Sequence, residues 1–293
     1  MVSAQSRTEL LVIVGETASG KSDLALKIAK AYRGEIIAAD SWTVYKGFDI
    51  GTGKPTITQQ KAVKHHLLDV RRPSDGFNAP MFKDLAEKAI EDIQKRGKLP
   101  ILVGGTGLYI DSVLYDFGFL PDVSGEERAK LNAMEIGALI ELAEKLNIDL
   151  SGIDTRNKRR VIRAIEAKGE KPTRKQMKDA VSIVGIRIPS EELRKKVERR
   201  TQQMLDAGLK KEVKQLSEQY GWEIEPMKGI GYREWKDYFE GEQSLEETKK
   251  RIVSSTMNLA KRQRTWFKRN PEISWFVGSK KAEAFLKQHL INI

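Results

Sequence analysis

Short apolar runs alternate with helical patterns along the first third of the chain. The runs at residues 10–14, 35–39 and 99–103 have the length and the apolar content of buried strands. Residues 23–32 and 79–96 instead place apolar side chains at helical spacing. Strands that alternate with helices pair in parallel, so the pattern predicts an α/β fold with a parallel sheet flanked by helices.

This alternation stops between residues 116 and 180. Residues 126–147 and 156–167 have helical periodicity, and no strand-like run separates them. We therefore expect a small inserted helical domain at 116–180. The core is expected to be discontinuous and to consist of residues 1–115 and 181–293.

Strand and helix signals return after the insertion. Residues 181–188 have the pattern of a core strand, and Ser190 is expected to cap the helix that follows. Ser244 and Glu247 have the spacing of a capping box, which predicts the start of a long helix. Residues 273–277 predict a final edge strand.

Composition limits the class of protein. The 293 residues are 32% charged and 40% apolar, which is typical of a soluble globular chain. No apolar run exceeds five residues, so we expect no membrane span. The first ten residues lack a signal-peptide pattern, so we expect a cytoplasmic protein. The chain has no cysteine, which excludes disulfides, a thiol nucleophile and a cysteine-ligated metal.

A glycine-rich motif, Gly-Glu-Thr-Ala-Ser-Gly-Lys-Ser, occupies residues 15–22 between the first predicted strand and the first predicted helix. In this context the spacing predicts a phosphate-binding loop. Its glycines allow backbone N–H groups to point inward, and the helix N-terminus adds partial positive charge. Lys21 would place a full charge on the outer phosphate, and Ser22 could hold Mg²⁺. The motif does not identify the phosphorylated ligand.

Three predicted strand ends meet at one edge of the sheet. They carry the phosphate loop, Asp40 and Thr106, and ligands of open α/β sheets bind at this edge. Asp40 could hold Mg²⁺ through water, accept a proton or bind a substrate hydroxyl; the alternative is that it caps the next turn. Arg233 follows two glycines, so its guanidinium could also reach the site. Of the adjacent His65 and His66, one is expected to be structural.

Two stretches are strongly basic. Four arginines of the predicted helix 156–167 share one of its faces. The stretch KRQRTWFKR at residues 261–269 mixes basic and aromatic residues, which suits single-stranded RNA because unstacked bases need flat partners. With a net charge of +11, these stretches favour a polyanionic partner such as nucleic acid. The alternatives are solvated charged helices, with the aromatic side chains of residues 261–269 facing the core.

Two classes of function remain open from these residues. One is a small-molecule kinase that uses ATP, with Asp40 activating a hydroxyl group. The other is a transferase that acts on nucleic acid with a phosphorylated donor, which would use the basic stretches. A nucleic-acid-binding NTPase is a third, less favoured option, because no later strand clearly ends in a carboxylate of the Walker-B type.

Six ordered motifs carry a family resemblance. They are GETASGKS, ADSWTVYKGFDIGTGKP, HHLLD, LVGGTGLY, GIGYREW and LAKRQRTWFKR. In this order they resemble tRNA dimethylallyltransferases, the IPP transferase family, and the resemblance spans most of residues 10–270. It implies transfer of a dimethylallyl group from dimethylallyl diphosphate to N6 of the adenosine just 3′ of a tRNA anticodon, with Mg²⁺. We expect a monomer whose insertion grips the anticodon stem-loop.

The resemblance also implies roles for individual residues. Asp40 would accept the N6 proton, Thr106 would contact the target adenosine and Arg233 would lie near the diphosphate; these are the expected catalytic residues. The expected diphosphate ligands are Gly15, Thr17, Ala18, Ser19, Gly20, Lys21 and Ser22, of which Ser22 is also the expected metal ligand. The expected tRNA contacts are Asp40, Ser41, Trp42, Thr43, Arg159, Arg160, Arg163, Lys261, Arg262, Gln263 and Arg264.

The sequence departs from the family pattern at several positions. Glu16 replaces a usual proline in the phosphate loop, and Thr43 replaces a usual glutamine or similar residue. The insertion is short, and residues 154–157 are Asp-Thr-Arg-Asn where the family usually has His-Pro-Asn-Asp. A carboxylate at position 16 would repel a diphosphate. We therefore expect Glu16 on the outer rim of the loop, or paired with a basic residue such as Arg233.

Overall fold

The structure is a computed structural model, which describes residues 9–120, 125–170 and 172–290. It divides into two compact units: a core of Met1–Leu114 with Lys178–Ile293, and an insertion of Tyr115–Met177. The boundaries expected from the sequence, 116 and 180, differ from these by one and three residues.

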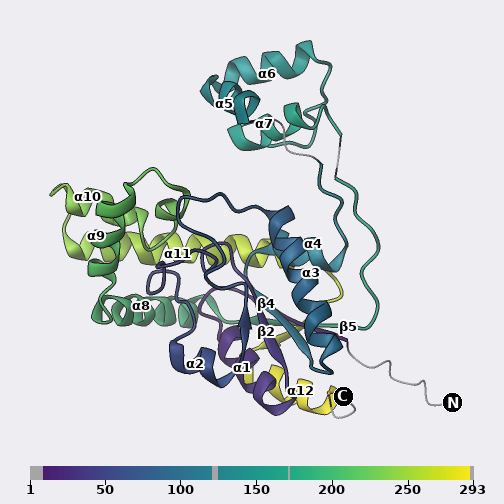
Figure 1. Ribbon diagram of the computed structural model, residues 1–293. Helices are drawn as coiled ribbons and strands as arrows, with labels where there is room; N and C mark the ends of the chain where they lie inside the picture. Colours follow the sequence, from purple (N-terminus) through teal and green to yellow (C-terminus); the bar gives the residue numbers. More distant parts are fainter. Residues whose placement is uncertain (1–8, 121–124, 171, 291–293) are drawn as a thin grey trace. The chain divides into compact units, whose positions relative to one another are not determined.

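The core contains a six-stranded parallel sheet in the order β3-β2-β4-β1-β5-β6 (Figure 1). The strands are β1 (Leu10–Gly15), β2 (Glu35–Ala39), β3 (His65–His66), β4 (Pro100–Gly104), β5 (Val181–Arg187) and β6 (Ser274–Val277). The predicted α/β fold is therefore confirmed, and the last strand lies at an edge as expected. Strand β1 lies inside the sheet and is buried along its whole length, which explains its uninterrupted apolar sequence.

The core also contains the helices α1 (Lys21–Ala31), α2 (Ile57–Ala62), α3 (Ala79–Lys95), α4 (Gly107–Leu114), α8 (Ser190–Asp206), α9 (Leu209–Tyr220), α10 (Lys236–Phe239), α11 (Leu245–Phe267) and α12 (Ser279–His289), with short 3₁₀ helices η1 (Glu225–Lys228) and η2 (Arg233–Trp235). The predicted capping box at the start of α11 is present: Ser244 and Glu247 each bond the other's backbone N–H.

Side chains of the central strand alternate between two covered faces. Leu11 and Ile13 of β1 belong to a buried cluster that also contains residues of α1 and α12. The intervening Val12 and Val14 are also fully buried. They therefore need a second layer of helices, and α3, α4 and α11 also contact strands of the sheet.

Strand β3 was not predicted. It consists of the two adjacent histidines, and one of them has a clear structural role. The ring Nε2 of His66 lies 2.7 Å from a carboxylate oxygen of the buried Glu35, at the start of β2. Arg96 and Lys98 donate to the same carboxylate, and these donors, Arg96 above all, hold the pKa of Glu35 well below its usual range. His66 is therefore structural, and its ring contacts the start of β2, which is the end opposite to Asp40.

The insertion is helical, as predicted, with α5 (Gly125–Ala133), α6 (Ile136–Lys145) and α7 (Lys158–Glu166). These helices bury an apolar cluster that includes Leu139 and Val161. The helical pattern over 126–147 corresponds to two helices and not to one continuous helix. Glu135 has an extended backbone, which separates α5 from α6, and no glycine or proline marks this break in the sequence.

The predicted arginine face in the insertion also needs a correction. Helix α7 begins at Lys158, because the side chain of Asn157 caps it by accepting the N–H of Arg160. Arg156 precedes the helix and donates from Nε to Asp154 at 3.0 Å. It therefore does not share a helix face with the later arginines.

Among the described residues, no helix has the length and apolar character needed to cross a bilayer.

Candidate functional site

The glycine-rich loop connects β1 to α1 at the carboxyl edge of the sheet. Gly20 has a φ of 90°, a left-handed conformation that glycine adopts without strain, and it leads directly into α1. The free N–H groups of the first turn of α1 therefore lie at the loop, where they favour an anion. The Nζ of Lys21 donates to the carbonyl of Glu16 at 3.2 Å, so the lysine is held across the loop.

A pocket of about 660 Å³ is lined by this loop, by residues 49–56 and by α8. Of the expected diphosphate ligands, Ala18, Ser19, Gly20, Lys21 and Ser22 line the pocket, whereas Gly15 and Thr17 do not. The Ser19 side chain is buried, so its hydroxyl is not exposed to a ligand. The basic lining residues are Lys21, Lys196, Arg199 and Arg200. Four cations beside a phosphate loop suit a small polyanionic ligand.

Arg200 of α8 is a site residue that the sequence reasoning missed. Its guanidinium approaches the backbone of residues 52–53 so closely that a Cβ on Gly53 would lie 1.8 Å from a guanidinium nitrogen. Burial lowers the pKa of Arg200, and the charges of Asp40 and Asp23 oppose this effect. The sequence did contain one indication of this role: Arg200 lies beside Val197 and Thr201, on the edge of the buried face of the helix.

Lys21 is electrostatically coupled to the same groups. Burial lowers the pKa of Lys21 to about 8; the charge of Asp40 opposes this effect, and the charge of Arg200 adds to it. Lys21, Arg200 and Asp40 therefore share one site, at which the two cations repel each other. A bound anion would stabilise both cations and raise the pKa of Lys21 again.

Asp40 directly follows β2, beside the loop. Its Oδ1 accepts hydrogen bonds from the backbone N–H groups of Trp42 at 2.8 Å and Thr43 at 3.4 Å. The predicted alternative, a turn cap, is therefore present through one oxygen. This cap fixes the carboxylate and leaves Oδ2 available for chemistry.

Thr106 lies beside this turn. Its hydroxyl accepts a hydrogen bond from the N–H of Ser41 at 3.2 Å, and its own N–H donates to Ala39 at 3.3 Å. The ends of β2 and β4 are thus tied together, as expected from the parallel sheet. Trp42 is half-buried, whereas the side chain of Thr43 is buried and its hydroxyl has no hydrogen-bond partner among the described residues. The expected tRNA contact at Thr43 is therefore not an exposed side chain.

Glu16 corrects an expectation of the sequence. It is not on the outer rim and does not pair with Arg233: its side chain is 2% exposed and forms an ion pair with Arg264 of α11. Arg264 was expected to contact tRNA. Its guanidinium also donates to the carbonyl of Ile188 at 3.1 Å and to the Ser190 hydroxyl at 3.4 Å, so it joins the loop, the end of β5 and the start of α8.

Gln263 was also expected to contact tRNA and is instead buried. Its carbonyl oxygen accepts the N–H of Thr17 at 2.8 Å, and its amide nitrogen donates to the carbonyl of Gly105 at 3.1 Å. Both polar atoms of the side chain are therefore used within the protein. Helix α11 holds the phosphate loop through two consecutive residues, Gln263 and Arg264.

The loop at residues 49–51 is held by Glu212 of α9. The Glu212 carboxylate accepts three backbone N–H groups, from Asp49, Ile50 and Gly51, at 2.8–3.2 Å. It also accepts the Tyr232 hydroxyl at 2.7 Å. Burial, followed by the charge of Glu212, raises the pKa of Tyr232 well above its usual range. A neutral tyrosine therefore remains a hydrogen-bond donor that positions this wall of the pocket.

Arg233 does not line the pocket. It is exposed and donates to Glu234 at 3.1 Å and to the Ser255 hydroxyl at 3.5 Å. The cation that the structure brings to the loop is Arg200 and not Arg233.

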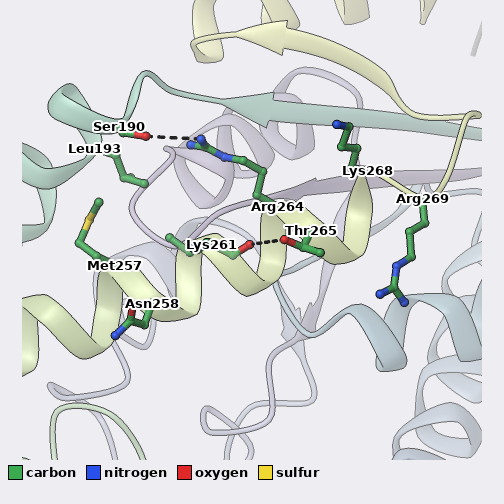
Figure 2. A pocket seen from close by; sticks show the side chains of 10 residues that line it. Ser190, Leu193, Met257, Asn258, Lys261, Arg264, Thr265, Lys268 and Arg269 are labelled. Atoms are coloured by element: carbon green, nitrogen blue, oxygen red, sulfur yellow. Dashed lines mark hydrogen bonds between the residues drawn. The ribbon is translucent and has the colours of Figure 1, made fainter. Parts of the chain in front are cut away.

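A second pocket, of about 900 Å³, lies between the start of α8 and the C-terminal half of α11 (Figure 2). It has an apolar side at Leu193 and Met257, and Lys261, Arg264, Lys268 and Arg269 supply positive charge. Arg264 points from α11 toward Ser190 (Figure 2). We call this pocket the α8/α11 groove.

The neighbouring residues of α11 divide between surface and interior. Lys261 and Arg262 are exposed, as an RNA contact requires. Phe267 is buried, and the Trp266 indole donates to Asp111 at 2.9 Å. The alternative prediction, that the aromatic side chains face the core, is therefore confirmed for Phe267 and in part for the half-buried Trp266.

The arginines of the insertion also divide into two kinds. Arg159 and Arg160 are exposed. Arg163 is half-buried: it donates to the carbonyl of Leu120 at 2.8 Å and lies 3.3 Å from the buried Glu166. Arg163 therefore has a structural role within the insertion.

Comparisons with known proteins agree on one family. The family model described as IPP transferase matches residues 43–270. The chain is 42% identical to tRNA dimethylallyltransferase 1 of Pelobacter propionicus, over 95% of each chain. It is 40% identical to tRNA dimethylallyltransferase of Pediococcus pentosaceus, over 92% of this chain and 90% of that protein.

Solved structures of tRNA-modifying transferases also resemble this chain. The full-length tRNA isopentenylpyrophosphate transferase of Bacillus halodurans superposes with a TM-score of 0.75, at 33% identity and 97% coverage of both chains. A eukaryotic dimethylallyltransferase acting on tRNA superposes with a TM-score of 0.78, at 25% identity, over 97% of this chain and 78% of that chain. The chain belongs to the IPP transferase family.

Proposed function

We propose that this chain transfers a dimethylallyl group from dimethylallyl diphosphate to N6 of the adenosine that follows a tRNA anticodon on its 3′ side. The observation that carries the proposal is the position of Asp40, a carboxylate fixed at a strand end and electrostatically coupled to Lys21 of the phosphate loop. Family membership supports this transferase activity over an ATP-dependent kinase.

The diphosphate of the donor would bind in the pocket at the glycine-rich loop. Lys21 and Arg200 supply full positive charges there, and the first turn of α1 supplies N–H groups. These groups favour the leaving group more as its negative charge grows, so they lower the barrier to its departure as well as binding it.

Ser22 and Asp23 suit a Mg²⁺ ion that accompanies the diphosphate. Both side chains are exposed and line the pocket, and hydroxyl and carboxylate oxygens are ligands that Mg²⁺ accepts together with phosphate oxygens and water. Ser22 would hold the ion. When bound, Mg²⁺ neutralises part of the diphosphate charge.

The transfer forms a nitrogen–carbon bond, breaks a carbon–oxygen bond and moves one proton. The adenosine N6 attacks the allylic carbon, the carbon–oxygen bond to the diphosphate breaks, and the electron pair leaves with the diphosphate. The N6 proton passes to Asp40, whose Oδ1 accepts backbone N–H groups while Oδ2 accepts none from the described residues. The half-buried Ser41, Trp42 and Thr106 beside this carboxylate would orient the adenine.

The exposed cations would bind the RNA. Lys261 and Arg262 of α11, and Arg159 and Arg160 of the insertion, are exposed members of the expected set. Phosphate contacts of this kind position an RNA without reading its sequence.

The deciding experiment is a transfer assay. Unmodified tRNA, dimethylallyl diphosphate and Mg²⁺ are incubated with the protein, the RNA is digested, and nucleosides are analysed by mass spectrometry. Isopentenyladenosine is expected, and its formation should depend on both substrates. Consumption of ATP without RNA, and no modified nucleoside, would instead support the kinase.

A further inference from the structure

The phosphate loop carries a buried carboxylate that a diphosphate-binding site would not be expected to contain. The Glu16 side chain is 2% exposed, and its charge is close enough to Lys21 to raise the pKa of that residue against the effect of burial. A negative charge at this position opposes a bound diphosphate. It therefore has to be neutralised from within the protein.

Arg264 provides this neutralisation. Its Nε donates to Glu16 Oε1, whereas Oε2 is buried without a hydrogen-bond partner among the described residues. The two terminal nitrogens of the guanidinium donate to the Ser190 hydroxyl and to the carbonyl of Ile188, and these bonds fix its orientation. Figure 2 shows the bond to Ser190. A buried carboxylate with one oxygen already unbonded depends strongly on its ion-pair partner.

The backbone of Glu16 connects this pair to the ligand site. The carbonyl of Glu16 accepts from both Lys21 Nζ and the N–H of Ser19. A shift of the Glu16 backbone would therefore displace Lys21, which lines the ligand pocket.

We propose that Arg264 is a positioning residue of the phosphate loop, which it holds and neutralises through Glu16, rather than a contact of the RNA. The inference rests on the proposed function only in taking a diphosphate as the ligand of the loop. Of the cations that line the α8/α11 groove, Arg264 thus supports donor binding.

Calorimetric binding of inorganic diphosphate with Mg²⁺ to the RNA-free protein tests the proposal. Arg264→Ala leaves the carboxylate unpaired, and should weaken diphosphate binding at least tenfold. The double variant Glu16→Gln with Arg264→Ala removes the unpaired charge, and should restore affinity to within about threefold of the parent. Lys250→Ala, on an exposed turn of the same helix, is the matched control and should leave diphosphate affinity unchanged.

The outcomes separate the alternatives. If Arg264→Ala binds diphosphate like the parent and loses only tRNA affinity, Arg264 is an RNA contact and the proposal is wrong. If Glu16→Gln does not restore affinity, Arg264 does not act through Glu16, and the proposal is also wrong. Should Arg264→Ala not fold, Arg264→Gln with and without Glu16→Gln gives the same comparison, because glutamine removes the charge and keeps a polar side chain. A failed transfer assay with this pattern of affinities intact would count against the proposed function alone.

Discussion

The side chain of Gln263 accepts a hydrogen bond from the backbone N–H of Thr17 at 2.8 Å, although 246 positions separate the two residues in the chain. Through this bond a helix near the C-terminus controls the shape of a loop near the N-terminus. The stretch that looks most like an RNA-binding surface in the sequence thus also supports the phosphate loop.

Loss of this bond should weaken donor binding. Gln263→Met keeps a similar volume and removes the contacts to Thr17 and Gly105. The half-buried N–H of Thr17 then loses its acceptor, at a cost of about 1–2 kcal/mol. We expect the donor KM to rise about fivefold to thirtyfold, with a smaller change in kcat. Steady-state kinetics at saturating tRNA measure the donor KM and kcat of both proteins. Thr265→Val on the exposed side of α11 should not reproduce the effect, and an unchanged KM in Gln263→Met would show that the bond is dispensable.

Arg200 should bind the diphosphate more strongly than its neighbour Arg199. Arg200 is half-buried beside Asp40, whereas Arg199 lines the same pocket from an exposed position. A hydrogen bond to a charged group contributes about 1.5–3 kcal/mol, so Arg200→Gln should raise the donor KM by about tenfold to a hundredfold. Arg199→Gln, the matched variant, should raise it by less than about threefold because its charge is screened. Equal effects of the two substitutions would contradict the site described above.

The lowered pKa of Lys21 predicts a pH dependence of donor binding. In the free protein Lys21 has a pKa of about 8, so its positive charge is present below that pH and is lost as the pH rises. Affinity for dimethylallyl diphosphate should therefore fall by up to tenfold for each pH unit above about 8, and binding near pH 8 should take up a proton. Calorimetry in buffers of different ionisation enthalpy measures both the affinity and the number of protons taken up. Lys21→Arg stays charged throughout this range and should bind without this loss. The same decline in both proteins would assign the titration to another group.

The insertion arginines should separate RNA binding from folding. Replacing the exposed Arg159 and Arg160 by Gln should flatten the slope of log K for tRNA against log salt by about one to two units. Arg163→Gln should instead destabilise the insertion by about 1–2 kcal/mol, because it removes the bond to Leu120 and one of the cations at the buried Glu166. Filter binding across a salt series measures the slope for each variant, and thermal unfolding measures its stability. A salt slope that responds only to Arg163→Gln would reverse these assignments.

Features that depend on local sequence were predictable. Leu10–Gly15, Glu35–Ala39 and the capping box at Ser244 follow from runs of apolar residues and from capping chemistry, which act within a few positions. The convergence of Asp40 and Thr106 also followed, because the ends of parallel strands must share an edge.

Features that depend on tertiary pairing were not predictable. Glu16 and Arg264 carry opposite charges that are 248 positions apart, and no local pattern identifies them as partners. Arg200, Lys196 and Arg199 look alike in the sequence, and only the packing of α8 decides which of them approaches Gly53. The internal contacts of Gln263 and Arg163 were not predicted for the same reason, since polar residues within basic stretches resemble surface residues.

The most direct test of the account is the single-turnover rate of transfer by Asp40→Asn, at saturating tRNA and dimethylallyl diphosphate. Asparagine can still accept the backbone N–H groups of Trp42 and Thr43 through its carbonyl oxygen, but it cannot take up the N6 proton. We expect isopentenyladenosine to form about 10²–10⁴-fold more slowly, with unchanged tRNA affinity. A rate within about threefold of the parent would mean that Asp40 only caps its turn, and would contradict its assignment as the base.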